Sequence, residues 1–189
     1  MPKFVLLMML MSSPVIASAK EPSKHTAYNF EFTSIEGQSL PMKSFAGKAV
    51  LLVNTASRCG FTRQYDDLQA VWERYRDLGL VVLGVPSNDF GNQEPGTASQ
   101  IKSFCEVNFN VDFPMTSKVA VKGKDAHPFY RWAAQQLGSS AKPRWNFHKY
   151  LISPDGQLVD WFSTPTSPTS KRVLRAIEAQ LTKTIGNAS

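Results

Sequence analysis

Two uninterrupted apolar runs, over residues 49–54 and 80–85, most constrain how this 189-residue chain can fold. A strand that is apolar at every position is buried on both faces, as are the central strands of parallel sheets. Between the two runs, large apolar side chains recur at helical spacing and share one face. These side chains are Tyr65, Leu68, Trp72 and Tyr75. A strand, a helix and a second strand in this order predict a right-handed parallel crossover.

Further elements are expected after and before this crossover. Residues 28–33 alternate apolar and polar side chains, which predicts a half-buried strand. Thr97 and Gln100 can form a capping box at the start of a helix over residues 97–108. Residues 125–137 indicate another helix, with His127 near its start in a structural role.

The C-terminal part of the chain predicts a hairpin and a final helix. Residues 149–153 and 157–162 are typical of strands, and residues 154–156 form the turn between them. The final helix is expected to begin near Ser167, because Pro168 is tolerated in a first helical turn. Together these elements predict an α/β protein with a thioredoxin-like fold, in which helices flank a central mixed sheet.

Residues 1–19 have the three parts of a secretory signal peptide: an early charge at Lys3, a short apolar stretch, and a small-residue end at Ala19. The stretch is shorter than the ~20 residues that span a bilayer, although an uncleaved membrane anchor is the alternative. We expect cleavage after Ala19, one domain over residues 20–189, and export to a bacterial periplasm or the extracellular space. Disulfides can form in such compartments.

Composition excludes several classes of protein. The 21 basic and 15 acidic residues give a net charge of +6, and the basic residues are dispersed, so nucleic acid is not an expected partner. The 42% hydrophobic content supplies a core, which excludes a disordered chain. Two cysteines and three scattered histidines fit neither a disulfide-rich scaffold nor a four-cysteine zinc site. No stable membrane insertion is expected of the mature chain.

Cys59 follows the first apolar run, at the expected carboxyl end of a central strand and directly before a helix. Sites form at that edge of open α/β sheets. A helix N-terminus favours a thiolate, and Arg58 and Arg63 would add positive charge. Position alone leaves open both a reactive nucleophile and a structural cysteine that is buried or disulfide-bonded.

Four segments resemble the glutathione peroxidase family, in its form with cysteine instead of selenocysteine, in order and in spacing. They are residues 54–62, 84–96, 113–115 and 145–147. The resemblance extends over about residues 27–182. It implies an enzyme that reduces hydrogen peroxide or organic hydroperoxides, with no metal or organic cofactor.

The resemblance also implies a catalytic set. Cys59 would be the peroxidatic nucleophile, and Gln93, Trp145 and Asn146 would donate hydrogen bonds to the thiolate and the peroxide oxygens. Fixed neutral donors suit the charge that develops on the departing oxygen. Without the resemblance, Gln93 and Asn146 could be turn residues and Trp145 a core aromatic residue.

Cys105 matches the resolving cysteine of family members that depend on thioredoxin. It would condense with the Cys59 sulfenic acid to give a disulfide, which a thioredoxin-like dithiol protein or glutathione would reduce. Cys105 shares an apolar face with Ile101 and Phe104, so a small core residue is the alternative. A disulfide needs Cα atoms within about 7 Å, and we therefore expect the helix over residues 97–108 to unravel partly during resolution.

Two departures from the family pattern lie close to these residues. Ser87 stands where many members have a third cysteine, and Asp89 adds a carboxylate that would oppose the thiolate or pair with Arg58 or Arg63. His148 could assist proton transfer or be an exposed neighbour of the site. The short segment 138–144 resembles that of monomeric members, so a monomer is expected.

Two other functions remain as alternatives. One is a non-catalytic secreted module in which a permanent Cys59–Cys105 disulfide has a structural role. The other is a thiol–disulfide oxidoreductase that acts on proteins. Cys59 lacks a Cys-x-x-Cys partner, since position 62 is Thr62, and this disfavours the second alternative.

Overall fold

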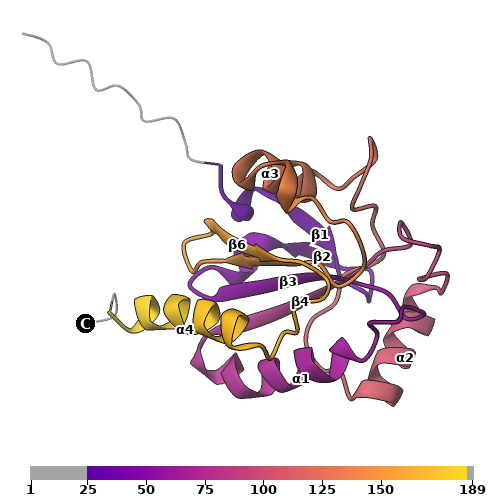
Figure 1. The fold of residues 1–189 in the computed structure, drawn as a ribbon, viewed down its shortest axis with the longest axis horizontal. Coiled ribbons are helices and arrows are strands. Elements are labelled where there is room, and N and C mark those ends of the chain that lie inside the picture. Colours follow the sequence, from indigo (N-terminus) through magenta and orange to yellow (C-terminus); the bar gives the residue numbers. More distant parts are fainter. Residues whose placement is uncertain (1–24, 187–189) are drawn as a thin grey trace, which may run out of the picture.

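The computed structural model describes residues 25–186, so the predicted signal peptide lies outside the described residues. A four-stranded mixed sheet in the order β4-β3-β5-β6 forms the centre (Figure 1). β3 (Ala49–Thr55) and β4 (Leu80–Pro86) are parallel, and every residue of both strands is buried. The two apolar runs therefore form the parallel pair that the sequence predicts, but only β3 is central, because β4 lies at the edge of the sheet, where Gly84 forms an isolated bridge with Met115.

The C-terminal hairpin completes the sheet. β5 (Lys149–Ile152) pairs with β3 in antiparallel orientation, and β6 (Leu158–Phe162) pairs with β5. β5 is buried at every position, whereas β6 is only partly covered. The predicted α/β arrangement with a mixed sheet is thus confirmed in the described part of the chain.

Helices cover both faces of the sheet (Figure 1). α1 (Gln64–Tyr75) and α4 (Lys171–Gly186) pack on one face, against side chains such as Leu51 and Val82. α3 (Pro128–Leu137) packs on the other face, with a two-stranded sheet of β1 (Glu31–Thr33) and β2 (Ser39–Pro41) beside it. Four short 3-10 helices connect these elements: η1 (Ala27–Asn29), η2 (Met42–Phe45), η3 (Arg76–Leu78) and η4 (Ser139–Ala141).

α2 (Ala98–Phe109) lies next to α1, beyond the end of β4 (Figure 1). Thr97 and Gln100 form the predicted capping box at its start, because each side chain accepts a hydrogen bond from the other's backbone amide. Asn110 ends the helix in the left-handed conformation, at φ 50°. None of the helices between residues 25 and 186 has the length and apolar content needed to cross a bilayer.

Three predicted boundaries of helices and strands are wrong, and two of them lie before the C-terminal hairpin. Only β1 is a strand within residues 28–33, because Thr26 caps η1 and holds residues 27–29 in a 3-10 turn. α3 begins at Pro128 rather than at residue 125, since the His127 side chain accepts the Phe129 amide and acts as its N-cap.

The last helix also begins later than predicted. Pro168 lies in a turn before α4, in which the Ser170 amide donates to the Ser167 carbonyl. Ser170 then accepts the Val173 amide through its hydroxyl and serves as the cap. Of the side chains expected to face the core, Val173, Ile177 and Leu181 are buried and Leu174 packs against them.

Gly84 lets residues 113–116 approach β4 closely. Its amide donates to the Pro114 carbonyl at 3.0 Å, and its carbonyl accepts the Thr116 amide at 2.8 Å. A Cβ atom at Gly84 would stand 3.2 Å from side-chain carbons of both Phe113 and Met115. The match at residues 113–115 therefore has a packing role beside the sheet.

A larger residue at Gly84 should destabilise the protein. Gly84→Val overpacks this contact, and we expect it to lower the free energy of unfolding by about 1–3 kcal/mol, measured by urea denaturation. Gly60→Ala is the control, since a Cβ atom there has no neighbour within 4 Å. Equal stability of the two variants would contradict this packing role.

His148 is buried directly before β5, contrary to the expectation of an exposed imidazole. Only 2% of it is exposed, and its ring stacks on Trp161 with centroids 5.3 Å apart. Burial, with a smaller contribution from the neighbouring Lys149 charge, lowers the pKa of His148 from 6.5 to about 4. Protonation of this side chain in the folded protein is therefore disfavoured at physiological pH.

This burial predicts a pH-dependent stability. The unfolded chain binds a proton at His148 near pH 6.5 and the folded chain only near the lowered pKa of about 4, so folding weakens as the pH falls between these values. His148→Phe keeps an aromatic ring against Trp161 and should flatten the fall of the thermal midpoint over that range. An unchanged slope in the variant would contradict the inference.

Candidate active site

The carboxyl ends of β3 and β4 bring three loop segments to one edge of the sheet. Because the two strands are parallel and Thr55 lies opposite Pro86, the segments that follow them leave the sheet side by side. β5 is antiparallel to β3, so the residues that precede β5 reach the same edge, where the Asn54 amide donates to the His148 carbonyl. The three segments carry Cys59, Gln93, and the pair Trp145 and Asn146.

Cys59 lies in a tight turn between β3 and α1, and only 7% of it is exposed. The Thr62 hydroxyl closes the turn by accepting the Cys59 amide at 3.0 Å and donating to the Cys59 carbonyl at 2.6 Å. The Phe61 amide donates to the thiol sulfur, with an N···Sγ distance of 3.4 Å. This amide is therefore a backbone hydrogen-bond donor placed directly at the sulfur.

The expectation that Cys59 directly precedes a helix is wrong, because α1 begins only at Gln64. The intervening residues form turns in which Thr62 donates to Cys59 and Gln64 donates to Phe61 through their backbones. Local hydrogen bonds of the Thr62 side chain compete with helix formation at this point. Arg58 and Arg63, the expected sources of positive charge, are both exposed.

Gln93 and Asn146 are hydrogen-bonded to one another at the site. The Asn146 amide nitrogen donates to the Gln93 side-chain oxygen at 2.8 Å, and Asn146 is fully buried. The Arg58 amide donates to the Gln93 carbonyl at 3.0 Å, which ties this pair to the Cys59 turn. Since its oxygen is engaged, the Gln93 amide group keeps its two N–H donors for other partners.

Trp145 is held at the edge of the site rather than in the core. Its carbonyl accepts the Asn54 side-chain amide at 3.2 Å, and its ring lies 5.8 Å from that of Phe90. The side chain is 39% exposed. The structure therefore places the indole where an incoming molecule can reach it.

Cys105 is deeply buried on α2, in the same apolar cluster as Cys59. It has no exposed surface, and the Tyr65 hydroxyl faces its thiol. Burial raises the pKa of Cys105 to about 11, so its thiol is protonated at neutral pH. Both cysteines are free thiols, and no disulfide joins them in this structure.

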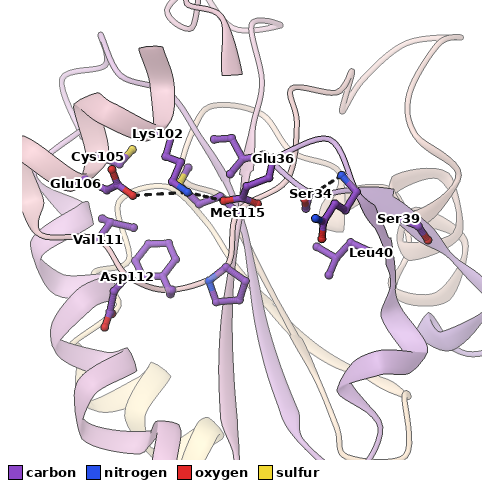
Figure 2. A pocket seen from close by; sticks show the side chains of 14 residues that line it. Ser34, Glu36, Ser39, Leu40, Lys102, Cys105, Glu106, Val111, Asp112 and Met115 are labelled. Atoms are coloured by element: carbon purple, nitrogen blue, oxygen red, sulfur yellow. Dashed lines mark hydrogen bonds and ion pairs between the residues drawn. The ribbon is translucent and has the colours of Figure 1, made fainter. Parts of the chain in front are cut away.

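A pocket of about 300 Å³ lies on the side of Cys105 that faces the β1–β2 turn (Figure 2). Lys102 of α2 bridges this pocket, with its ammonium 2.7 Å from the Glu36 carboxylate of that turn and 3.8 Å from Glu106. In Figure 2, the ion pair between Lys102 and Glu36 links α2 to the turn between β1 and β2. Movement of the helix that carries Cys105 would break it.

Asn146 is supported by residues that were not predicted from the sequence. The Thr164 hydroxyl donates to the Asn146 carbonyl at 2.7 Å, and the Thr164 carbonyl in turn accepts the Gln64 side-chain amide at 2.7 Å. The Nζ atom of the fully buried Lys149 donates to the carbonyls of Thr166 and Thr164 at 2.7 and 3.3 Å, and burial lowers the pKa of Lys149 to about 7. Lys149 was expected only as a strand residue, and its polar character within an apolar strand was the signal for this role.

Glu94 is a second residue that the sequence did not single out. It is 1% exposed, and burial raises its pKa although Ser57, Lys118 and Arg58 act in the opposite direction. Its amide donates to the Asn88 side chain at 2.8 Å, which helps to fix the loop that carries Gln93.

The two departures from the family pattern have structural roles. The Asp89 carboxylate accepts the backbone amides of Val121 and Lys122 at 2.6 and 3.0 Å. It therefore holds the segment before α3 and does not pair with Arg58 or Arg63, as was considered from the sequence. Ser87 is fully buried at the end of β4, and its hydroxyl accepts the Asp89 amide.

A sequence model of the glutathione peroxidase family matches residues 27–134. This match contains Cys59, Gln93 and Cys105 and ends before Trp145 and Asn146. It extends over more than half of the chain and contains three of the four segments that carry the resemblance, while the fourth, at residues 145–147, lies beyond it.

Individual relatives and solved structures agree with this family match. "Glutathione peroxidase-like peroxiredoxin GPX5" of Chlamydomonas reinhardtii is 46% identical over 145 residues, which are 76% of this chain and 90% of that protein. "Hydroperoxy fatty acid reductase gpx1" of a Synechocystis strain is 40% identical over 154 residues, 77% of this chain and 91% of that protein. The crystal structure of Trgpx in apo form has a TM-score of 0.69 at 31% identity, covering 85% of this chain and 97% of that one.

These similarities confirm the predicted thioredoxin-like α/β fold and a peroxidase function. With the family match and the relatives in agreement, the chain belongs to the glutathione peroxidase family and is a thiol peroxidase.

Proposed function

We propose that Cys59 is the peroxidatic nucleophile and that Gln93, Trp145 and Asn146 are its hydrogen-bond donors. The observation that carries this proposal is the 2.8 Å hydrogen bond between Asn146 and Gln93, which come from loops far apart in the chain. Together with the bond from the Arg58 amide to the Gln93 carbonyl, it holds both residues beside the turn that carries Cys59, as a shared role at the thiol requires. Neutral amide and indole N–H groups can stabilise the charge on a departing oxygen without adding a negative charge of their own.

The proposed reaction begins with attack of the Cys59 thiolate on one peroxide oxygen. The S–O bond forms as the O–O bond breaks, so the sulfur is oxidised to sulfenic acid and the peroxide is reduced. The departing oxygen takes up a proton and leaves as water, or as an alcohol when the substrate is an organic hydroperoxide. Each turnover therefore consumes two electrons from the thiol.

Cys105 is proposed to resolve the sulfenic acid. Its sulfur would attack the Cys59 sulfur, the S–S bond would form as the S–O bond breaks, and water would leave. Because Cys105 is buried and protonated inside α2, this step requires the helix to unravel partly and to bring the two Cα atoms within about 7 Å.

A thioredoxin-like dithiol protein is the proposed reductant of the Cys59–Cys105 disulfide, and glutathione is the alternative. A resolving cysteine supports the dithiol protein, because it makes two molecules of glutathione unnecessary. The names of the relatives include both "glutathione peroxidase" and "peroxiredoxin". A non-catalytic role with a permanent disulfide is not favoured, since the relatives are peroxidases and both thiols are free.

We also propose that the mature protein is exported and acts as a monomer. The signal-peptide pattern of residues 1–19 supports export, and the short segment 138–144 supports the monomer. In a periplasm or outside the cell, reducing electrons would have to cross the membrane to the reductant.

Removal of one donor should slow the first step without unfolding the protein. Gln93→Ala is expected to lower the second-order rate constant of Cys59 oxidation by hydrogen peroxide about 10²-fold, because the departing oxygen loses a fixed donor. Stopped-flow fluorescence of the reduced protein measures that rate. Gln136→Ala on the exposed side of α3 is the matched control and should react like wild type. Equal oxidation rates in the two variants would show that Gln93 is not a hydrogen-bond donor in this reaction.

Loosening α2 should speed the second step. Lys102→Ala removes the ion pair with Glu36, and we expect disulfide formation after sulfenic acid formation to accelerate roughly twofold to fivefold. Rapid quenching followed by thiol counting measures this rate. Lys43→Ala, at another exposed lysine, should leave it unchanged. A resolving rate in Lys102→Ala equal to that of wild type would show that this contact does not hold the helix.

A further inference from the structure

The peptide that joins Asn146 to Phe147 is strained. Phe147 has a positive φ of 60°, in the left-handed region that bulky side chains rarely adopt. Its side chain is fully buried, and its ring meets that of Tyr65 edge-on, with centroids 5.4 Å apart. Such a conformation persists only where the surrounding structure holds it, and it often occurs at functional sites.

Hydrogen bonds fix the strained peptide on both sides. The Phe147 amide donates to the Asn54 carbonyl of β3 at 2.6 Å, and the Asn146 carbonyl accepts the Thr164 hydroxyl at 2.7 Å. Among the described residues, the Asn146 side chain bonds to Gln93 alone, because its Oδ1 atom has no hydrogen-bond partner there. The direction of the Asn146 amide therefore depends on the backbone beneath it, to which Thr164 contributes one of the two bonds.

Thr164 is held in turn by two buried donors. The Gln64 side chain donates to the Thr164 carbonyl at 2.7 Å, and the Lys149 Nζ atom donates to the same carbonyl at 3.3 Å. Gln64 is the first residue of α1, which follows the turn that carries Cys59. Thr164 therefore connects the start of that helix with the backbone of Asn146.

Lys149 is a fully buried amine at the first residue of β5. Its Nζ atom also donates to the Thr166 carbonyl at 2.7 Å. Burial lowers the pKa of Lys149, and the charge of Asp67 opposes this shift, but the Asp67 carboxylate accepts the Ser167 hydroxyl at 2.8 Å instead of the amine. Burial of an amine costs free energy, so this lysine is explained by the two carbonyls that it satisfies and thereby holds in place.

We propose that Lys149 and Thr164 are positioning residues for the oxidation of Cys59. Lys149 fixes the segment that carries Thr164, and the Thr164 hydroxyl then fixes the strained peptide, so that the amides of Asn146 and Gln93 keep one orientation beside the thiol. Neither positioning residue touches the peroxide, and the bonds that form and break are those of the first step above. The inference rests on the proposed function of the three site residues. Support of the fold alone predicts no effect on the oxidation rate.

The first test separates donor placement from thiol reactivity, in a Cys105→Ser background that leaves Cys59 as the sole thiol. The rate constant of Cys59 is measured with hydrogen peroxide and with iodoacetamide. Both reagents react with the thiolate, but the departing iodide needs no fixed donor. Thr164→Val removes the hydroxyl at constant size, and we expect it to lower the ratio of the peroxide rate to the iodoacetamide rate about tenfold. Thr164→Ser keeps a hydroxyl and should return the ratio to near that of the parent protein.

Thr116→Val is the matched control. Thr116 is also buried, and its hydroxyl donates to the Ser117 carbonyl at 2.8 Å, beside β4 and outside the site. The control variant loses a buried hydroxyl of the same kind and should leave the ratio unchanged. Equal ratios in Thr164→Val and Thr116→Val would overturn the proposal, because Thr164 would then only support the fold.

Lys149→Met tests the residue that anchors Thr164, since it keeps an unbranched side chain and removes the donor. The expected loss of the ratio is again about tenfold. The double variant Thr164→Val/Lys149→Met should lose no more than either single variant, because both residues act through the same peptide. Losses that multiply to about a hundredfold would show that Lys149 acts by a separate route, and would overturn its place in the proposal.

Heteronuclear NMR of the Asn146 side-chain amide separates failure of this proposal from failure of the catalytic one. We expect the amide signals of the reduced protein to shift in Thr164→Val and Lys149→Met and not in Thr116→Val. If Cys59 of the parent protein reacts with hydrogen peroxide no faster than free cysteine, the proposed function fails and the positioning role fails with it, even where the signals shift. If the parent reacts rapidly and Thr164→Val changes neither the ratio nor the signals, the positioning proposal fails alone.

Discussion

The burial of β3 on both faces is the constraint on which the rest of the structure depends. All seven of its residues are buried, and it pairs with β4 on one side and β5 on the other. Apolar side chains on both faces require cover from both sides, which α1 and α4 provide on one face and α3 on the other. The same pairing brings the three loops to one edge of the sheet, so the strand at the centre of the core also positions the proposed active site.

The two thiols have different surroundings. Cys59 lies in a turn held by Thr62, where the Phe61 amide donates to its sulfur. Cys105 lies in the core, where burial raises its pKa, and the resolving role that we propose for it requires α2 to open. In that proposal, native stability opposes the resolving step, and the surface contacts of α2 set how strongly it does so.

Much of the fold was predictable because it follows from local patterns. The apolar runs predicted β3 and β4, and the capping box predicted α2. Trp145 and Asn146 were proposed from the motif at residues 145–147, and the structure places Asn146 in contact with Gln93. Predictions failed where side chains compete with regular structure: Thr62 delays α1, Ser170 delays α4, and Thr26 replaces part of a strand by η1. The support of Asn146 by Thr164 and Lys149 was not predictable, because it depends on contacts between loops that only the folded chain brings together.

Oxidation by a single equivalent of hydrogen peroxide tests the central claim most directly. Intact mass and free-thiol count are measured for reduced mature protein, as wild type, Cys59→Ser and Cys105→Ser. We expect rapid loss of both thiols in wild type, a sulfenic acid trapped in Cys105→Ser, and no rapid reaction in Cys59→Ser. If neither thiol of the wild type reacts faster than free cysteine, Cys59 is not a peroxidatic nucleophile.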